Sequence, residues 1–157
     1  MTIANKSSLF NQNPIAVSAV LGVCLSLVAC DLAVAPPETG AQSIRWSDGD
    51  SGEIDGVRFR LVDVDAPETG PIGSSKGARC QRERDRGRSA KVFMEALTEN
   101  AALSMRVFET DQYGRLVIGL DADGENVITA AIDAGHLKDW PHENGRALTV
   151  KPDWCGT

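Results

Sequence analysis

The stretch that decides the fold is residues 54–68, which read IDGVRFRLVDVDAPE. The Asp-Gly pair near its start is typical of a two-residue turn between antiparallel strands. Apolar residues then alternate with Arg58 and Arg60, so the second strand has one apolar face and one basic face. Simple alternation would place Asp63 on the apolar face. Either the strand bends near Val62, or Asp63 has a partner elsewhere in the chain.

Further strands and two helices are expected around this hairpin. Apolar residues at i, i+4 and i+7 from Ala90 predict one helix, although Gly87 weakens its first turns by about 1 kcal/mol. We expect strands at 42–46, 103–107 and 116–120, and helices at 82–99 and 127–134, with Gly135 ending the second helix. The order β-β-β-α-β-β-α predicts an α+β fold: a five-stranded, OB-like Greek-key barrel over residues 42–135. An irregular C-terminal extension, 136–157, follows it.

The N-terminal 29 residues are typical of an export signal. Lys6 is their single charged side chain, and an apolar run too short to span a bilayer follows it. The run ends in Leu-Val-Ala-Cys at 27–30, which resembles the lipobox of bacterial lipoproteins. We therefore expect a signal peptide over 1–29, lipidation of Cys30 and a flexible tether over 30–41. Cleavage after Ala35, giving a secreted protein without a lipid, is the alternative.

This signal predicts an exported protein on the periplasmic side of a bacterial cell envelope, attached to the membrane only through the lipid on Cys30. Two cysteines then remain, Cys80 and Cys155, and an even pair in an oxidising compartment favours a disulfide. In the chain-entropy model such a bridge stabilises the fold by about 4 kcal/mol. Two free thiols are the alternative.

Composition limits the classes of function. The 157 residues are 42% hydrophobic and 24% charged, which suits one ordinary domain plus an appendage. The formal net charge of −6 argues against a protein that coats nucleic acid through bulk charge, but it allows a local basic cleft. Arginines and a lysine cluster over 79–91. They could follow a single-stranded nucleic acid backbone, or they could form a solvated helix face.

Five polar side chains near the expected strand ends could carry chemistry together. Asp50 and Asp65 are hard oxygen ligands that suit Ca²⁺ if they lie close together. Glu68 is near enough in sequence to Asp65 to act as a general base on a water molecule. Arg60 and Arg115 have planar guanidinium groups that match two phosphate oxygens. Such a set meets the needs of phosphodiester hydrolysis, which activates a water and stabilises added negative charge.

Three motifs resemble, in order and spacing, the signatures of the staphylococcal nuclease (thermonuclease) family. They are D-G-D-S at 48–51, R-L-V-D-V-D-A-P-E at 60–68 and D-Q-Y-G-R at 111–115. The resemblance covers about residues 42–135. It implies an OB-like barrel and a Ca²⁺-dependent endonuclease that hydrolyses phosphodiester bonds in DNA and RNA. It also implies cleavage at the 5′-oxygen, which leaves 3′-phosphates.

Carried over position by position, the resemblance implies a role for each matching residue. Asp50, Asp65 and the carbonyl of Ala66 would be the Ca²⁺ ligands. The other implied roles are Glu68 as the base that activates water, Arg60 and Arg115 as ligands of the phosphate, and Tyr113 beside the bound nucleotide. The expected substrate is DNA or RNA, single-stranded or frayed, and the expected state is a monomer.

The sequence also departs from the family pattern. Ser51 and Gln112 stand where the founding member has threonine and lysine, and the long C-terminal helix of that enzyme is not expected here. The acidic charge predicts weaker substrate affinity and steeper salt sensitivity than in that basic enzyme. Two other hypotheses stay open: a catalytically silent module of the same family that binds nucleic acid or protein, and a cell-envelope interaction protein.

Overall fold

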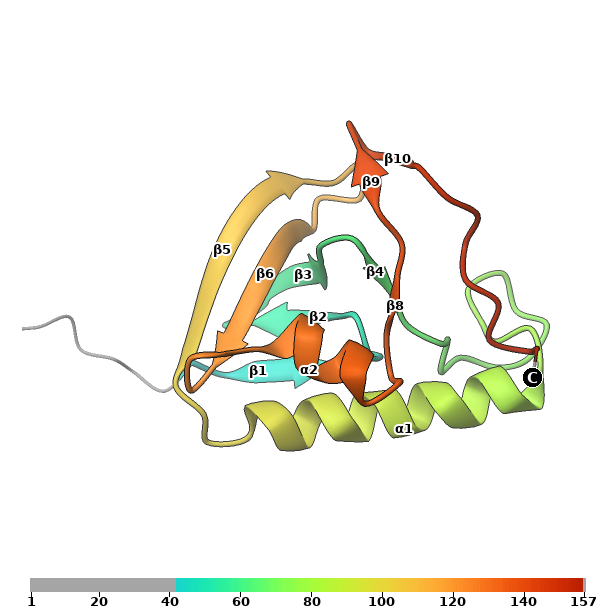
Figure 1. Ribbon diagram of the computed structural model, residues 1–157, viewed down its shortest axis with the longest axis horizontal. Helices are drawn as coiled ribbons and strands as arrows, with labels where there is room; N and C mark the ends of the chain where they lie inside the picture. Colours follow the sequence, from blue (N-terminus) through green and yellow to red (C-terminus); the bar gives the residue numbers. More distant parts are fainter. Residues whose placement is uncertain (1–41, 157) are drawn as a thin grey trace, which may run out of the picture. The chain divides into compact units, whose positions relative to one another are not determined.

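A mixed β-sheet and two helices make up residues 42–156, the part of the chain that the computed structural model describes (Figure 1). The fold is therefore α+β. The expected signal peptide, the lipidation of Cys30 and the tether lie outside the described residues. Within residues 42–156, no helix is both long enough and apolar enough to cross a membrane.

The main sheet has the strand order β1-β2-β3-β6-β5, with the short β7 added beside β6. Its strands are β1 (Ile44–Trp46), β2 (Ser51–Ile54), β3 (Val57–Leu61), β5 (Leu103–Thr110), β6 (Leu116–Ala122) and β7 (Glu125–Asn126). The pairing of β3 with β6 is parallel, and the other pairings are antiparallel. The five main strands thus match the expected ones in number and order along the chain.

The expected closed barrel is not present. Within residues 42–156 no hydrogen-bonded ladder joins β1 to β5, so the sheet is open between them. β1 has three residues, and its buried Trp46 donates from Nε1 to Oγ1 of Thr98 at 3.0 Å. This bond ties the short strand to helix α1 (Gln81–Thr98), which runs alongside it (Figure 1).

The hairpin predicted from the Asp-Gly pair is present, with Ile54 opposite Val57. Asp55 and Gly56 have φ angles of 50° and 80°, which the two central positions of a type I′ turn require. The question raised by Asp63 is also answered. Asp63 has a φ of 54°, so the chain turns there, and its Oδ1 accepts the backbone N–H of His142 at 2.8 Å.

Helix α1 begins one residue earlier than expected, after Cys80, whose sulfur accepts a backbone N–H of the first turn at 3.4 Å. The glycine that weakens this helix has a packing role. A Cβ on Gly87 would lie 2.6 Å from the carbonyl oxygens of both Pro67 and Glu68. Glycine therefore lets the helix lie directly against the backbone that carries Glu68.

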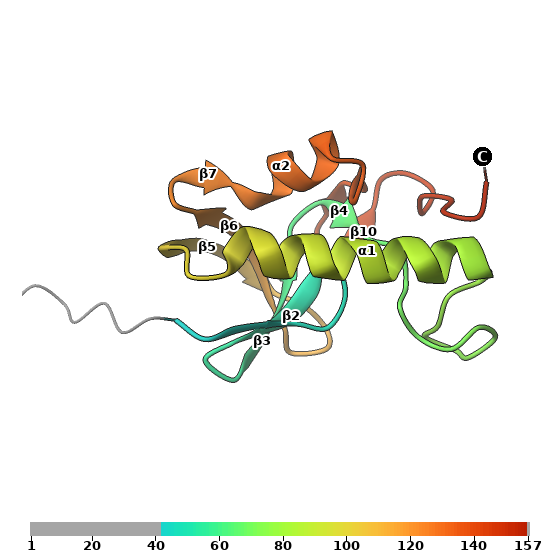
Figure 2. The same cartoon turned by 90° about the horizontal axis from the view of Figure 1, so that it is seen from below.

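The second helix, α2 (Val127–Asp133), lies beside α1 (Figure 2). The side chain of Asn126 caps its start by accepting the N–H of Thr129 at 2.9 Å. Gly135, with a φ of 76°, follows its end as predicted. The apolar core is formed mainly by residues of the main sheet and of both helices; its largest fully buried members are Trp46, Phe59, Leu61, Met94, Ile118, Leu120 and Leu137. Trp154 is buried outside this cluster.

The C-terminal extension is less irregular than expected. It contains three two-residue strands, β8 (Lys138–Asp139), β9 (His142–Glu143) and β10 (Arg146–Ala147). β8 pairs with β4 (Val64–Asp65), and β9 pairs with β10 across Asn144 and Gly145, whose φ angles of 50° and 73° fit a type I′ turn. The Asn-Gly pair was the sequence signal for this hairpin. Residues 148–156 have no regular structure, and we call them the C-terminal strap.

Candidate active site

One cavity of about 610 Å³ brings together the polar side chains that the motifs singled out. Its lining includes Asp50, Arg60, Asp65, Glu68, Tyr113 and Arg115. These residues come from the β1–β2 turn, from β3 and β4, from the loop after β4, and from the β5–β6 turn. The side chain of Ala66 is not part of the lining, but its backbone N–H donates to Oδ2 of Asp50 at 3.0 Å.

The turn before β2 is shaped by its own side chains. Oδ1 of Asp48 accepts the backbone N–H of Asp50 at 3.1 Å, which fixes the direction in which Asp50 leaves the turn. A Cβ on Gly49 would lie 2.8 Å from the Cβ of Ala90 and 2.9 Å from the Cβ of Ala66. The glycine therefore lets the turn pack between helix α1 and the loop after β4.

Asp50 is in an environment that suits a bound cation. Burial raises the pKa of Asp50 well above its ordinary value of 3.8, and the neighbouring Asp48 raises it further. Arg60 and the N–H of Ala66 lower the same pKa but do not restore it. A crowded pair of carboxylates of this kind is stabilised by a positive ion. Carboxylate oxygens are ligands that suit a divalent cation, and Asp50 and Asp65 could supply them if Asp65 exchanged its contacts with Lys151 and Trp154.

Asp65 is buried, with 2% of its surface exposed, and both of its carboxylate oxygens have partners. Oδ2 accepts from Nε1 of Trp154 at 2.8 Å, and Oδ1 lies 3.2 Å from Nζ of Lys151. Both partners belong to the C-terminal strap, more than 80 residues away in sequence. The strap therefore forms part of the candidate site.

Glu68 lies at the same end of the cavity. Its Oε1 is 3.1 Å from Nζ of Lys151. Burial raises the pKa of Glu68 above its ordinary value of 4.5, while the hydrogen bond and charge of Lys151 act in the opposite direction. Asp48 and Asp65 raise the same pKa further. A carboxylate with a raised pKa is a better proton acceptor once it is ionised, which suits a general base.

The two arginines approach the cavity from β3 and from the β5–β6 turn, and each is held in place. A terminal nitrogen of Arg60 donates to the carbonyl of Val64 at 3.0 Å, and its guanidinium lies 5.8 Å from the ring centre of Trp140. Nε of Arg115 donates to Oδ2 of Asp111 at 2.8 Å. Such contacts reduce the entropy lost when a phosphate binds between the two groups.

Tyr113 is on the rim of the cavity, with 62% of its surface exposed. Its ring lies 5.6 Å from the guanidinium carbon of Arg115, and its carbonyl accepts from Arg58 at 2.6 Å. A nucleic acid base can stack on an exposed aromatic ring of this kind while the neighbouring arginine binds the phosphate.

Several lining residues were not predicted from the sequence. They are Arg58, Ser75, Lys76, Trp140 and Lys151. Arg58 lies on the basic face of β3 and could have been predicted from the alternation of apolar residues and arginines in this strand. For Lys151 the one sequence signal was indirect: it precedes Cys155 by four residues, and a disulfide to Cys80 would bring this part of the chain back to the fold.

The comparison with known proteins agrees with this geometry. The family model of the staphylococcal nuclease homologues matches residues 58–138. The chain belongs to the staphylococcal nuclease family. Two curated proteins, from Escherichia coli and Escherichia coli O157:H7, are each named "Uncharacterized endonuclease" and are each 31% identical to it over 114 residues.

The aligned part is 69% of this chain and 65% of each relative, so the chain spans less than two thirds of the length of these relatives. The name "Uncharacterized endonuclease" belongs to these two relatives. The family is typically metal-dependent, which agrees with the carboxylates around Asp50.

Proposed function

We propose that this protein is a Ca²⁺-dependent endonuclease that hydrolyses phosphodiester bonds in DNA and RNA and leaves 3′-phosphates. The observation that supports this most strongly is the single cavity lined by two acidic candidates for metal binding, a third carboxylate and two oriented arginines. Each group is weak support by itself, but together they supply what the reaction needs.

In this proposal the two arginines, Arg60 and Arg115, hold the phosphate and stabilise the charge that it gains in the transition state. Glu68 takes a proton from a water molecule whose oxygen bonds to phosphorus. The bond from phosphorus to the 5′-oxygen breaks, the 5′-oxygen takes a proton from solvent, and the phosphate stays on the 3′-oxygen. Ca²⁺ bound by Asp50, Asp65 and the carbonyl of Ala66 would add positive charge beside the phosphate.

The direct test is to incubate the full chain with plasmid DNA and with RNA, in Ca²⁺ or in excess chelator. Cleavage in Ca²⁺ alone, with products that phosphatase treatment converts to 3′-hydroxyl ends, supports the proposal. Absence of Ca²⁺-dependent cleavage would contradict it. Binding without turnover would instead indicate a silent binding module.

Replacing the presumed base tests the mechanism. We expect Glu68→Gln to lower kcat by roughly 10²-fold or more, because the amide cannot accept the proton of the attacking water. Glu95→Gln is the matched control, since Glu95 is exposed on α1 and its nearest cation is Lys91, at 3.8 Å. Equal rates for Glu68→Gln and the wild type would remove Glu68 from this role.

We also propose export to the cell envelope as a lipoprotein, on the basis of the lipobox-like sequence that ends at Cys30. Labelling of cells with a palmitate analogue should mark the wild type but not Cys30→Ser. Cys24→Ser should still be labelled, because Cys24 follows a bulky valine that suits the signal poorly. Label on Cys30→Ser would exclude lipidation at this position.

A further inference from the structure

The C-terminal strap places one charged side chain inside the candidate active site. Nζ of Lys151 lies 3.2 Å from Oδ1 of Asp65 and 3.1 Å from Oε1 of Glu68. It also lies 5.7 Å from the ring centre of Trp140. The ammonium thus stands between a proposed metal ligand and the proposed base, in the same cavity as the two arginines.

The strap is fixed to the fold directly after this lysine. Trp154 is buried, with 2% of its surface exposed, and its Nε1 donates to Oδ2 of Asp65 at 2.8 Å. Cys155 is bonded to Cys80, at the start of α1, with their Cα atoms 6.0 Å apart. Nζ of Lys138 donates to the carbonyl of Asp153 at 2.8 Å.

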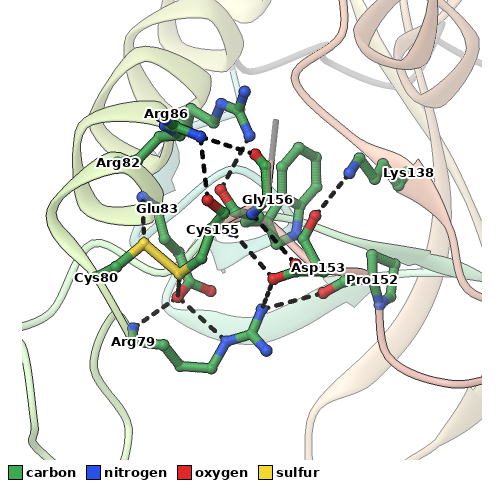
Figure 3. Close-up of a disulfide and its surroundings, with 11 residues drawn as sticks. Arg79, Cys80, Arg82, Glu83, Arg86, Lys138, Pro152, Asp153, Cys155 and Gly156 are labelled. Carbon is green, nitrogen blue, oxygen red and sulfur yellow. Dashed lines mark hydrogen bonds and ion pairs between the residues drawn. A yellow bond between two sulfur atoms is a disulfide. The ribbon is translucent and has the colours of Figure 1, made fainter.

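Arginines of the basic cluster add a second set of contacts (Figure 3). Arg82 donates to the carbonyls of Cys155 and Gly156, both at 3.1 Å. Arg86 donates to the carbonyl of Trp154 at 2.9 Å, and Arg79 pairs with Asp153 at 3.1 Å. These three arginines are exposed, as expected for a solvated helix face, and they also bind the C-terminal strap. The cluster also contributes no residue to the lining of the cavity.

The strap brings Lys151 to two carboxylates that differ in exposure: the side chain of Asp65 is 3% exposed and that of Glu68 is 33% exposed. The side chain of Lys151 is itself 41% exposed and lines the cavity, so a ligand in the cavity can reach its ammonium. The two arginines in the cavity are oriented by protein acceptors, whereas a lysine side chain is a flexible point charge with three donor hydrogens. Its ammonium pairs with Asp65 and Glu68, and a bound phosphate would compete with these carboxylates for its three donor hydrogens.

We propose that Lys151 is a further substrate-binding residue of the active site. Its ammonium binds an oxygen of the nucleic acid phosphate that lies between Arg60 and Arg115, and the disulfide-anchored strap holds it there. The inference rests on the proposed function for its substrate class. It adds to the site a cation that lies outside the matched segment 58–138.

Binding measured without cleavage tests this role. The full, oxidised chain is titrated in excess chelator with a fluorescein-labelled single-stranded DNA of about ten nucleotides, at several salt concentrations. Lys151→Met should weaken binding about 10-fold and make the slope of log K against log salt shallower by about 0.7, the value for one phosphate contact on a single strand. Lys151→Arg should restore most of the affinity and the slope, since it keeps the charge.

Lys76→Met is the matched control. Because Lys76 lines the same cavity, a second control is Lys91→Met: Lys91 lies on α1 outside the lining and pairs with Glu95 at 3.8 Å, so that variant removes the same charge away from the site. A loss in either control as large as that of Lys151→Met would mean that only general charge matters, which overturns the proposal. Thermal melts verify folding, and Lys151→Gln replaces any methionine variant that does not fold.

A second readout separates the rival role, in which the ammonium only shields Asp65 from a metal ion. Terbium(III) luminescence, sensitised by the nearby tryptophans, reports metal binding directly. Tighter terbium binding by Lys151→Met with unchanged DNA affinity would overturn the proposal in favour of shielding. Wild type that binds DNA but never cleaves it contradicts the proposed function alone, while wild type that does not bind DNA overturns this inference.

Discussion

Asp111 is not one of the proposed catalytic residues, but it orients one of them, Arg115. Partial burial by itself would raise the pKa of Asp111, but the N–H groups of Arg115 and Tyr113 and the charge of Arg115 lower it below 3.8. The carboxylate is thus held ionised and receives the guanidinium of Arg115 at 2.8 Å. Its position in the D-Q-Y-G-R motif is explained by this contact: it aims the arginine at the cavity.

We therefore expect Asp111→Asn to lower both the free energy of unfolding at pH 7 and the kcat of cleavage. Because the folded pKa of Asp111 is depressed, its stabilisation is fully present above the unfolded pKa and is lost as the pH falls through the folded value. The stability difference between wild type and variant should shrink in acid. Denaturant titrations from pH 7 downward measure it.

Asp85→Asn is the control for this prediction, since Asp85 is exposed and accepts a hydrogen bond from Gln81 within α1. It should change neither kcat nor the acid dependence of stability. A stability difference for Asp111→Asn that stays constant over the whole pH range would show that the carboxylate charge is not what stabilises the turn.

At the residue scale, the sequence predicted the candidate site residues that belong to a recognisable motif. Asp50, Asp65, Glu68 and the two arginines could be proposed because hard oxygen ligands and guanidiniums recur at fixed spacing around turns. Trp140, Lys151 and Trp154 could not. They come from a segment without periodicity, and only the folded chain brings them near Asp65.

Within helix α1, Gly87 has opposite effects on helix propensity, which it lowers, and on tertiary packing, which it permits. Within α1 a glycine costs about 1 kcal/mol relative to alanine, so Gly87→Ala should stabilise an isolated helix. In the fold, the new Cβ would lie 2.6 Å from two backbone carbonyl oxygens, which forces the loop that carries Glu68 to move. We expect a net destabilisation of roughly 1–3 kcal/mol and a lower kcat.

Ser89→Ala is the matched helix substitution, because Ser89 is exposed on α1. It should raise stability slightly and leave kcat unchanged. Thermal melts and initial rates on the same preparations compare the two variants. Greater stability of Gly87→Ala than of wild type would mean that the helix does not press on the loop after β4.

The elements that could be predicted are those with a local signal. The Asp-Gly hairpin and both helices follow from turn chemistry and apolar spacing within a few residues. The closed barrel was wrong because closure depends on pairing between β1 and β5, which are far apart in sequence, and β1 instead packs on α1. The β9–β10 hairpin was missed although Asn144-Gly145 is a turn signal, because no alternating apolar run flanks it.

At the scale of the whole molecule, the anchoring of the strap ties the C-terminal end of the folded region to helix α1 and to β4. Trp154 is buried, while the disulfide fixes the last turn of the chain to the first turn of α1. The lining of the cavity holds five basic and four acidic residues, although the chain has a net charge of −6. If Lys151 binds phosphate as proposed, the affinity for a polyanion depends on the position of the strap as well as on the overall charge.

Removing the disulfide tests this whole-molecule coupling. The bridge closes a segment with a sequence separation of 75 residues, and the chain-entropy model predicts that Cys80→Ser with Cys155→Ser lowers the free energy of unfolding by about 4 kcal/mol. Single-stranded DNA affinity in chelator should fall toward that of Lys151→Met, because the lysine is then held less firmly. Guanidinium titrations and the same fluorescence assay measure both effects. A stable double variant with wild-type affinity would show that Trp154 and the arginines position the strap without the disulfide.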